Sequence, residues 1–219
     1  MGRDGYPRAM MHLGRIIAGA AVLALLGGCL TVAGRAPVTR VDIVPGDLAL
    51  GAPGGYCVDH SRNQRGQDSV FVLLASCAAI SGDPAQPRPV FPAILTATVD
   101  LQPITAESFA EIREALPEYF ARADIRATLS RDGTAQSIEL LTAEQTGDMF
   151  ILHARDSSQD ASPALAEDLW RALYLERGYL VSVTLLALSD RPISDQAARR
   201  TLAEFVSATR RANRQGETG

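Results

Sequence analysis

The sequence contains no lysine, only three histidines, three cysteines and one tryptophan in 219 residues. All 21 basic residues are therefore arginines, and the 25 acidic residues give a net charge of −4. A mildly acidic chain does not suit nucleic acid as a partner, because phosphate binding needs a basic surface. Hydrophobic residues make up 47% of the chain, which excludes a disordered protein and allows one sizeable core.

The sequence also lacks an apolar run that fits a membrane-spanning helix. The run from Ile16 to Gly28 has 13 residues, whereas a spanning helix needs about 20. Arginines precede this run and small residues end it, which is the three-part pattern of a secretory signal. We therefore expect residues 1–28 to be a signal peptide, whether translation starts at Met1 or at Met11.

The segment Leu26-Gly27-Gly28-Cys29 stands where this signal ends. It resembles the lipobox of bacterial lipoproteins. The resemblance implies a diacylglycerol on the Cys29 thiol, cleavage before Cys29, and acylation of the new amino terminus with fatty acids such as palmitate. Several acyl chains on one terminus make membrane attachment effectively permanent. An ordinary signal peptide with a chance cysteine and a retained signal anchor are the alternatives.

Leu30 follows the cysteine, and by resemblance to lipoprotein sorting it implies the outer membrane, where Asp would not. We expect residues 29–44 to form a flexible tether on the periplasmic side, residues 45–212 a single domain, and residues 213–219 a frayed tail. "VDIV" (41–44) and "LAL" (48–50) are alternative starts of the sheet. Removal of residues 1–28 leaves 18 arginines and 24 acidic residues, a net charge of −6.

The domain alternates strand patterns with helix patterns. A helix is expected from Thr105, with Phe109, Ile112, Leu116 and Phe120 on its buried face and a break at Pro117. A second helix is expected from Ser194, and a short one over residues 162–169, where Pro163 suits the first helical position. The strand patterns cover residues 54–60, 68–80, 93–101, 125–130, 136–141 and 148–154. Residues 170–188 fit either a long helix or two strands about a turn at Glu176-Arg177-Gly178, and their β-branched, alternating residues favour the strands.

This order predicts an α+β fold, a mainly antiparallel sheet flanked by helices. The succession "GYCVDH" then "FVLLASC", and "LWRALYLERGYLVSVTLLAL" before a C-terminal helix, resembles the PsbP-like α/β/α sandwich of photosynthetic accessory proteins and some bacterial lipoproteins. The chain also resembles uncharacterised lipoproteins of alphaproteobacteria. The PsbP-like resemblance covers residues 45–212 and implies a non-enzymatic binding or assembly domain.

Two cysteines remain once Cys29 is assigned to lipid. In an oxidising periplasm the pair Cys57 and Cys77 favours a disulfide. Two separate buried thiols are one alternative. A metal site that adds His60 and His153 is another, but no CxxC or HxxxH spacing supports it, and we expect no metal or cofactor.

Catalytic motifs are equally sparse. Asp59-His60-Ser61 contains the residue types of a hydrolase triad, but neighbours in a strand point to opposite faces, so these three cannot assemble one. The sequence has no GxSxG, no HExxH and no phosphate-binding glycine-rich loop. We therefore expect no catalytic residues and no enzyme activity.

The sequence favours a lipid-anchored binding or envelope-assembly module, held at the membrane through its N-terminal lipid and acting on an envelope protein. The alternative is a small-ligand-binding or hydrolytic domain. That alternative predicts a deep pocket between sheet and helix that holds His60, His153 or Tyr56.

Overall fold

A computed structural model describes residues 37–158 and 162–215. An eight-stranded sheet dominates these residues, in the order β3-β5-β6-β10-β9-β8-β7 with β4 beside β5. Every pairing within it is antiparallel. Its strands are β3 (Tyr56–Val58), β4 (Gln64–Arg65), β5 (Ser69–Ser76), β6 (Ala93–Asp100), β7 (Ile138–Thr146), β8 (Met149–Asp156), β9 (Leu165–Glu176) and β10 (Tyr179–Leu188).

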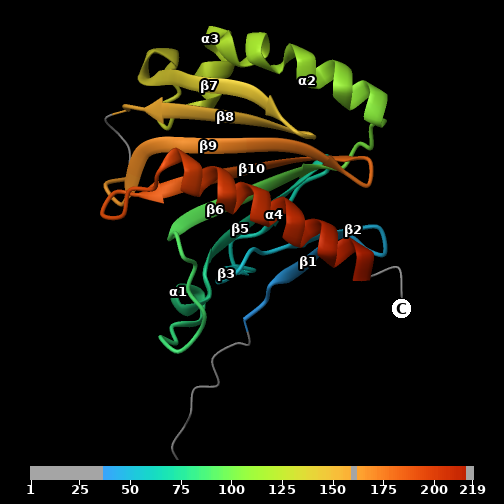
Figure 1. The fold of residues 1–219 in the computed structure, drawn as a ribbon, viewed down its shortest axis with the longest axis vertical. Helices are drawn as coiled ribbons and strands as arrows, with labels where there is room; N and C mark the ends of the chain where they lie inside the picture. Colours follow the sequence, from blue (N-terminus) through green and yellow to red (C-terminus); the bar gives the residue numbers. More distant parts are fainter. Residues whose placement is uncertain (1–36, 159–161, 216–219) are drawn as a thin grey trace, which may run out of the picture. The chain divides into compact units, whose positions relative to one another are not determined.

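Helices and a small hairpin complete the domain (Figure 1). The helices are α1 (Cys77–Ser81), α2 (Ala106–Ala121), α3 (Ala123–Leu129) and α4 (Asp195–Gln215), with a short 3-10 helix at Ala135–Ser137. The hairpin pairs β1 (Arg40–Val44) with β2 (Leu48–Gly51) as a separate two-stranded sheet. Among the described helices, none is both long and apolar enough to cross a membrane.

Two hydrophobic clusters lie on opposite faces of the sheet. Ile151 in β8 belongs to the cluster that α4 covers with Leu202 and Phe205. Its neighbour Phe150 belongs to the other cluster, where Phe120 of α2 stacks on it at 5.8 Å between ring centroids. Because successive strand residues point to opposite faces, α2 and α4 flank the sheet from its two sides. The predicted α+β fold class, with helices flanking a mainly antiparallel sheet, is confirmed.

Burial alternates along β5, and the strand is shorter than the pattern at residues 68–80 predicts. Val70, Val72 and Leu74 are buried, while Phe71 and Leu73 between them are half-buried, so the strand is not enclosed equally on both faces. The strand ends at Ser76, and the rest of the expected strand forms α1.

Two expected elements are of the wrong type. Residues 125–130 were expected as a strand, but Ile125 to Leu129 belong to α3, which buries Leu129 in the cluster of the α2 side. Residues 162–169 were expected as a short helix, but the chain turns there and enters β9 at Leu165. Pairing with both β8 and β10 provides hydrogen-bond partners for the backbone N–H and C=O groups of β9. This stabilisation outweighs the local preference for a helix at Ser162-Pro163.

Three boundaries also differ. The strand β1 occupies Arg40–Val44, inside the stretch expected as tether, and α4 extends through residues 213–215 of the expected frayed tail. Pro117 lies inside α2 without ending it. Burial of Leu116 and Phe120 on either side of the proline stabilises the helix against the loss of one backbone hydrogen bond. Ile112, expected on the buried face, is 38% exposed.

Thr105, where the sequence predicts the start of a helix, caps the N-terminus of α2. Its hydroxyl accepts a hydrogen bond from the backbone N–H of Ser108 at 3.1 Å. We expect Thr105→Ala to lower the free energy of unfolding by about 1 kcal/mol, because the mutation leaves that N–H without its partner. Urea denaturation measures the change. Thr105→Ser keeps the acceptor oxygen and serves as the control, so an equal loss in both variants would contradict the capping role.

Candidate functional site

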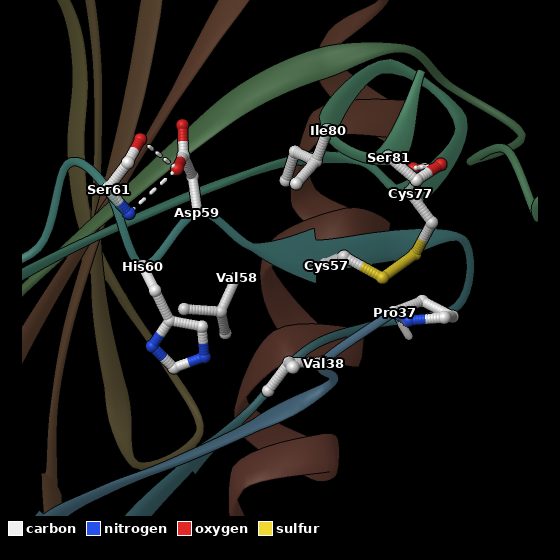
Figure 2. Close-up of a pocket in the computed structure, with 10 residues that line it drawn as sticks. All are labelled: Pro37, Val38, Cys57, Val58, Asp59, His60, Ser61, Cys77, Ile80 and Ser81. Atoms are coloured by element: carbon white, nitrogen blue, oxygen red, sulfur yellow. Dashed lines mark hydrogen bonds between the residues drawn. A yellow bond between two sulfur atoms is a disulfide. The ribbon is translucent and has the colours of Figure 1, made fainter. Parts of the chain in front are cut away.

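A hollow of about 200 Å³ lies beside the two cysteines (Figure 2). It brings together three parts of the chain, namely the residues before β1, the end of β3 with the turn after it, and α1. Its lining includes the apolar side chains of Val38, Val58 and Ile80 together with the polar residues His60 and Ser81. Pockets for small molecules usually measure about 300–1,000 Å³, so this hollow suits at most a very small ligand.

The three neighbouring residues Asp59, His60 and Ser61 do not form a reacting set. The backbone N–H and the hydroxyl of Ser61 both donate to the Asp59 carboxylate, at 3.0 and 2.6 Å, in a local turn. Figure 2 shows the His60 ring pointing away from that carboxylate, toward Val38. A nucleophile needs its base within hydrogen-bond distance, and here the serine faces the aspartate without the histidine.

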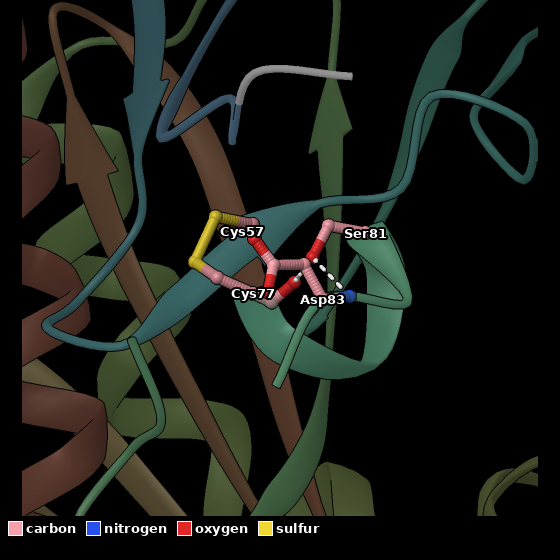
Figure 3. The surroundings of a disulfide bond; sticks show 4 residues. All are labelled: Cys57, Cys77, Ser81 and Asp83. Atoms are coloured by element: carbon pink, nitrogen blue, oxygen red, sulfur yellow. Dashed lines mark hydrogen bonds between the residues drawn. A yellow bond between two sulfur atoms is a disulfide. The ribbon is translucent and has the colours of Figure 1, made fainter. Parts of the chain in front are cut away.

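Cys57 and Cys77 are joined at disulfide-bond distance, 1.98 Å between sulfurs (Figure 3). The pair connects β3 to the first residue of α1. Both residues are buried, at 1% and 2% exposure, which favours a structural role because thiol exchange requires access to a sulfur. The Ser81 hydroxyl donates to the Cys77 carbonyl at 2.8 Å and accepts from the Asp83 N–H at 3.2 Å, so it closes the short helix beside the disulfide.

The alternative metal set is not assembled. Cys57 and Cys77 are paired with each other, and His153 lies on β8, away from His60. Within residues 37–158 and 162–215, no group of three or more His, Cys, Asp or Glu side chains is placed to hold a metal ion.

Tyr56 is 2% exposed, and its hydroxyl donates to the Phe91 carbonyl at 2.7 Å. Burial raises the pKa of this phenol. Tyr56 borders a different hollow, of about 230 Å³, with Arg200 and Glu204 of α4. His60, His153 and Tyr56 therefore lie in three separate surroundings rather than in one pocket.

His153 has neighbours that the sequence analysis did not find. Its ring stacks on Trp170 with centroids 4.4 Å apart, and its Nε2 lies 2.8 Å from the Asp168 carboxylate. The Trp170 indole N–H donates to Asp195 at 2.9 Å, and the Arg199 guanidinium donates to the same carboxylate at 2.7 Å. We call these five residues the His153 cluster.

The His153 cluster connects β8, β9 and the first turn of α4. Burial acts to raise the pKa of Asp195, but the hydrogen bonds from Arg199 and Trp170 outweigh it and hold the pKa below its usual value. Both carboxylates thus have cationic or N–H partners, and the arrangement fixes the start of α4 on the sheet. Alternation along β9 places Asp168 and Trp170 on one face, but the pairing of β8 with β9 was needed to bring His153 beside them.

Cys29, the predicted lipidation site, lies outside the described residues. The sequence matches no protein-family model, and none of the curated proteins is detectably similar to it.

Proposed function

We propose that this chain is a lipid-anchored protein of the bacterial cell envelope whose folded domain binds an envelope protein and catalyses no reaction. The observation that carries the proposal is Leu26-Gly27-Gly28-Cys29 at the end of a charged and then apolar N-terminal segment. A cysteine at this point resembles the modified residue of lipoproteins. Leu30 after it supports the periplasmic face of the outer membrane as the location.

The disulfide supports an exported domain. Disulfides persist in oxidising compartments such as the periplasm and are rare in the cytosol. Cys57 and Cys77 are bonded to each other and buried, so no other thiol follows the lipobox in the chain. One cysteine for lipid and two for a disulfide account for every cysteine of the sequence.

The arrangement of the polar residues supports binding over catalysis. Asp59 and Ser61 bond to each other without His60. In the His153 cluster, Asp195 accepts hydrogen bonds from Trp170 and Arg199, and Asp168 lies 2.8 Å from His153 Nε2. A permanent anchor raises the local concentration of the domain at one surface, which benefits binding of a partner held at the same surface. The resemblance to PsbP-like binding domains agrees with this proposal.

Crosslinking in intact cells tests the proposed role. We expect the lipid-anchored protein to capture one reproducible envelope protein. The same domain exported behind an ordinary cleaved signal, without Cys29, should capture less of it, because the domain then diffuses through the whole periplasm. Equal capture by both forms would contradict the role of the anchor.

Turnover would favour the alternative function. If the purified domain converts a small substrate and His60→Ala abolishes the reaction, the domain is an enzyme. His60 is exposed and has no hydrogen-bond partner among the described residues, so its replacement leaves the fold intact and isolates any catalytic role.

A further inference from the structure

The described chain enters the domain beside α1. Pro37 and Val38 line the same hollow as Ile80 and Ser81, and the Val38 carbonyl accepts a hydrogen bond from the Val58 N–H at 2.8 Å. Figure 1 shows the start of β1 and α1 at the same end of the domain. The end that carries α1 is therefore the end to which the N-terminal segment is attached.

The length of that segment limits how far this end can move from an anchor. Cys29 precedes Pro37 by eight residues. Each residue spans at most about 3.5 Å, so the Cys29 Cα lies within about 28 Å of the Pro37 Cα. An anchor at Cys29 would hold the α1 end close to the membrane surface.

The charges at the α1 end balance, because Asp83 and Arg88 lie in the α1 segment and the exposed Asp190 and Arg191 line a hollow with Arg88. We define the α1 surface as the exposed residues between Cys77 and Ala93. Arg88 is the charged residue among them, and the partly exposed Asp83 of the same stretch carries the opposite charge. Val90 is 85% exposed and Ile80 is 36% exposed, and they are two of the four large apolar side chains exposed in the described residues. The α1 surface consists of Ala79, Ile80, Gly82, Pro84, Ala85, Pro87, Arg88 and Val90.

The helix α2 lies at the other end of the domain in Figure 1 and differs from the α1 end in charge, although it exposes the other two large apolar side chains, Ile112 and Tyr119. Its exposed charged residues are all acidic, namely Glu107, Glu111, Glu114 and Glu118. Negative charge is repelled by anionic lipid headgroups, whereas an arginine near them is attracted by about 1 kcal/mol. This difference in charge favours an orientation in which the α1 end faces an anionic bilayer and α2 points away from it.

We propose that the α1 surface lies against the phospholipid bilayer that holds the anchor, with Val90 and Ile80 at the boundary between headgroups and acyl chains. This inference rests on the proposed lipidation of Cys29. Arg88 sits among the apolar residues, where its guanidinium can reach lipid phosphates while its methylene groups stay at the apolar boundary. The glutamates of α2 face away from the membrane, and the bilayer is the single occupant of the α1 surface.

Quenching by brominated lipids tests this orientation. The natural Trp170 is 2% exposed and gives a constant background. We expect Val90→Trp, in lipidated protein reconstituted into vesicles of phosphatidylethanolamine and phosphatidylglycerol, to lose most of its added fluorescence when the acyl chains are brominated. Ile112→Trp on α2 is the matched control, since Ile112 is also exposed, and it should lose almost none. Ile80→Trp provides a second reporter on the α1 surface if Val90→Trp does not fold.

Mass spectrometry of each preparation shows whether Cys29 is lipidated. This measurement separates a failure of the orientation from a failure of the proposed function. If Cys29 is lipidated but the α1 surface reporter is quenched no more than Ile112→Trp, the orientation is wrong and the anchor stands. If Cys29 carries no lipid, both proposals fail. Strong quenching confined to the α1 surface supports the orientation.

Discussion

Cys29→Ala is expected to abolish incorporation of labelled palmitate in growing cells. The thioether bond to diacylglycerol requires a thiol, and alanine has no nucleophilic atom in its side chain. Cleavage and acylation of a new N-terminus at residue 29 follow that modification in the lipoproteins that the segment resembles. The full signal from lipid should therefore be lost. Phosphorimaging of the immunoprecipitated protein after labelling measures it.

Leu30→Ala is the matched control for this experiment. It changes the next residue and keeps the cysteine, so its palmitate incorporation should equal that of the wild type. Equal label in the wild type and in Cys29→Ala would contradict lipidation at this residue. It would favour an ordinary signal peptide with a chance cysteine, or another acylated residue.

Reduction of the Cys57–Cys77 disulfide is expected to lower the free energy of unfolding by about 3 kcal/mol, because the bond closes a loop of about 20 residues and restricts the unfolded chain. The test uses the domain exported behind an ordinary cleaved signal, so that no lipid is attached. Urea denaturation of the oxidised and reduced protein measures the difference. Reduction keeps both sulfur atoms, so it isolates the effect of the bond.

The double variant Cys57→Ala, Cys77→Ala extends this measurement. It should be destabilised by at least as much as the reduced protein, because it also removes buried sulfur atoms from the contact between β3 and α1. Coincident unfolding curves for the oxidised and reduced proteins would contradict the stabilising role. Two cysteines that alkylate freely in the exported protein would contradict the bond itself.

Long periodic segments of the fold were predictable from the sequence. The apolar residues of α4, which include Ala198, Leu202 and Phe205, recur every three to four residues along the helix expected from Ser194, and they are buried. The hairpin of β9 and β10 was predictable because Val181, Val183 and Leu185 alternate with smaller or polar residues and a glycine follows Arg177 at the turn. In these segments local pattern and tertiary packing favour the same structure.

Segments where local and tertiary preferences differ were predicted wrongly. The β-branched residues of 125–130 favour a strand, but burial of Leu129 against the α2 side of the sheet stabilises the helix α3. Ser162 and Pro163 are good helix-start residues, yet the chain after them pairs with two strands. A local sequence pattern does not show how much β9 is stabilised by pairing with β8 and β10.

The candidate site was predictable only in part. The pairing of Cys57 with Cys77 followed from the number of cysteines and from their place in consecutive predicted strands. The His153 cluster was not predictable, because β8, β9 and α4 supply its residues and only the register of the sheet brings them together.

The mass of the N-terminal tryptic peptide of the membrane-purified protein tests lipidation most directly. Trypsin cuts after Arg35, so the account predicts a peptide of residues 29–35 that begins at Cys29 and carries diacylglycerol and an amide-linked acyl chain. An unmodified Cys29, or a peptide that spans the bond between Gly28 and Cys29, would contradict it.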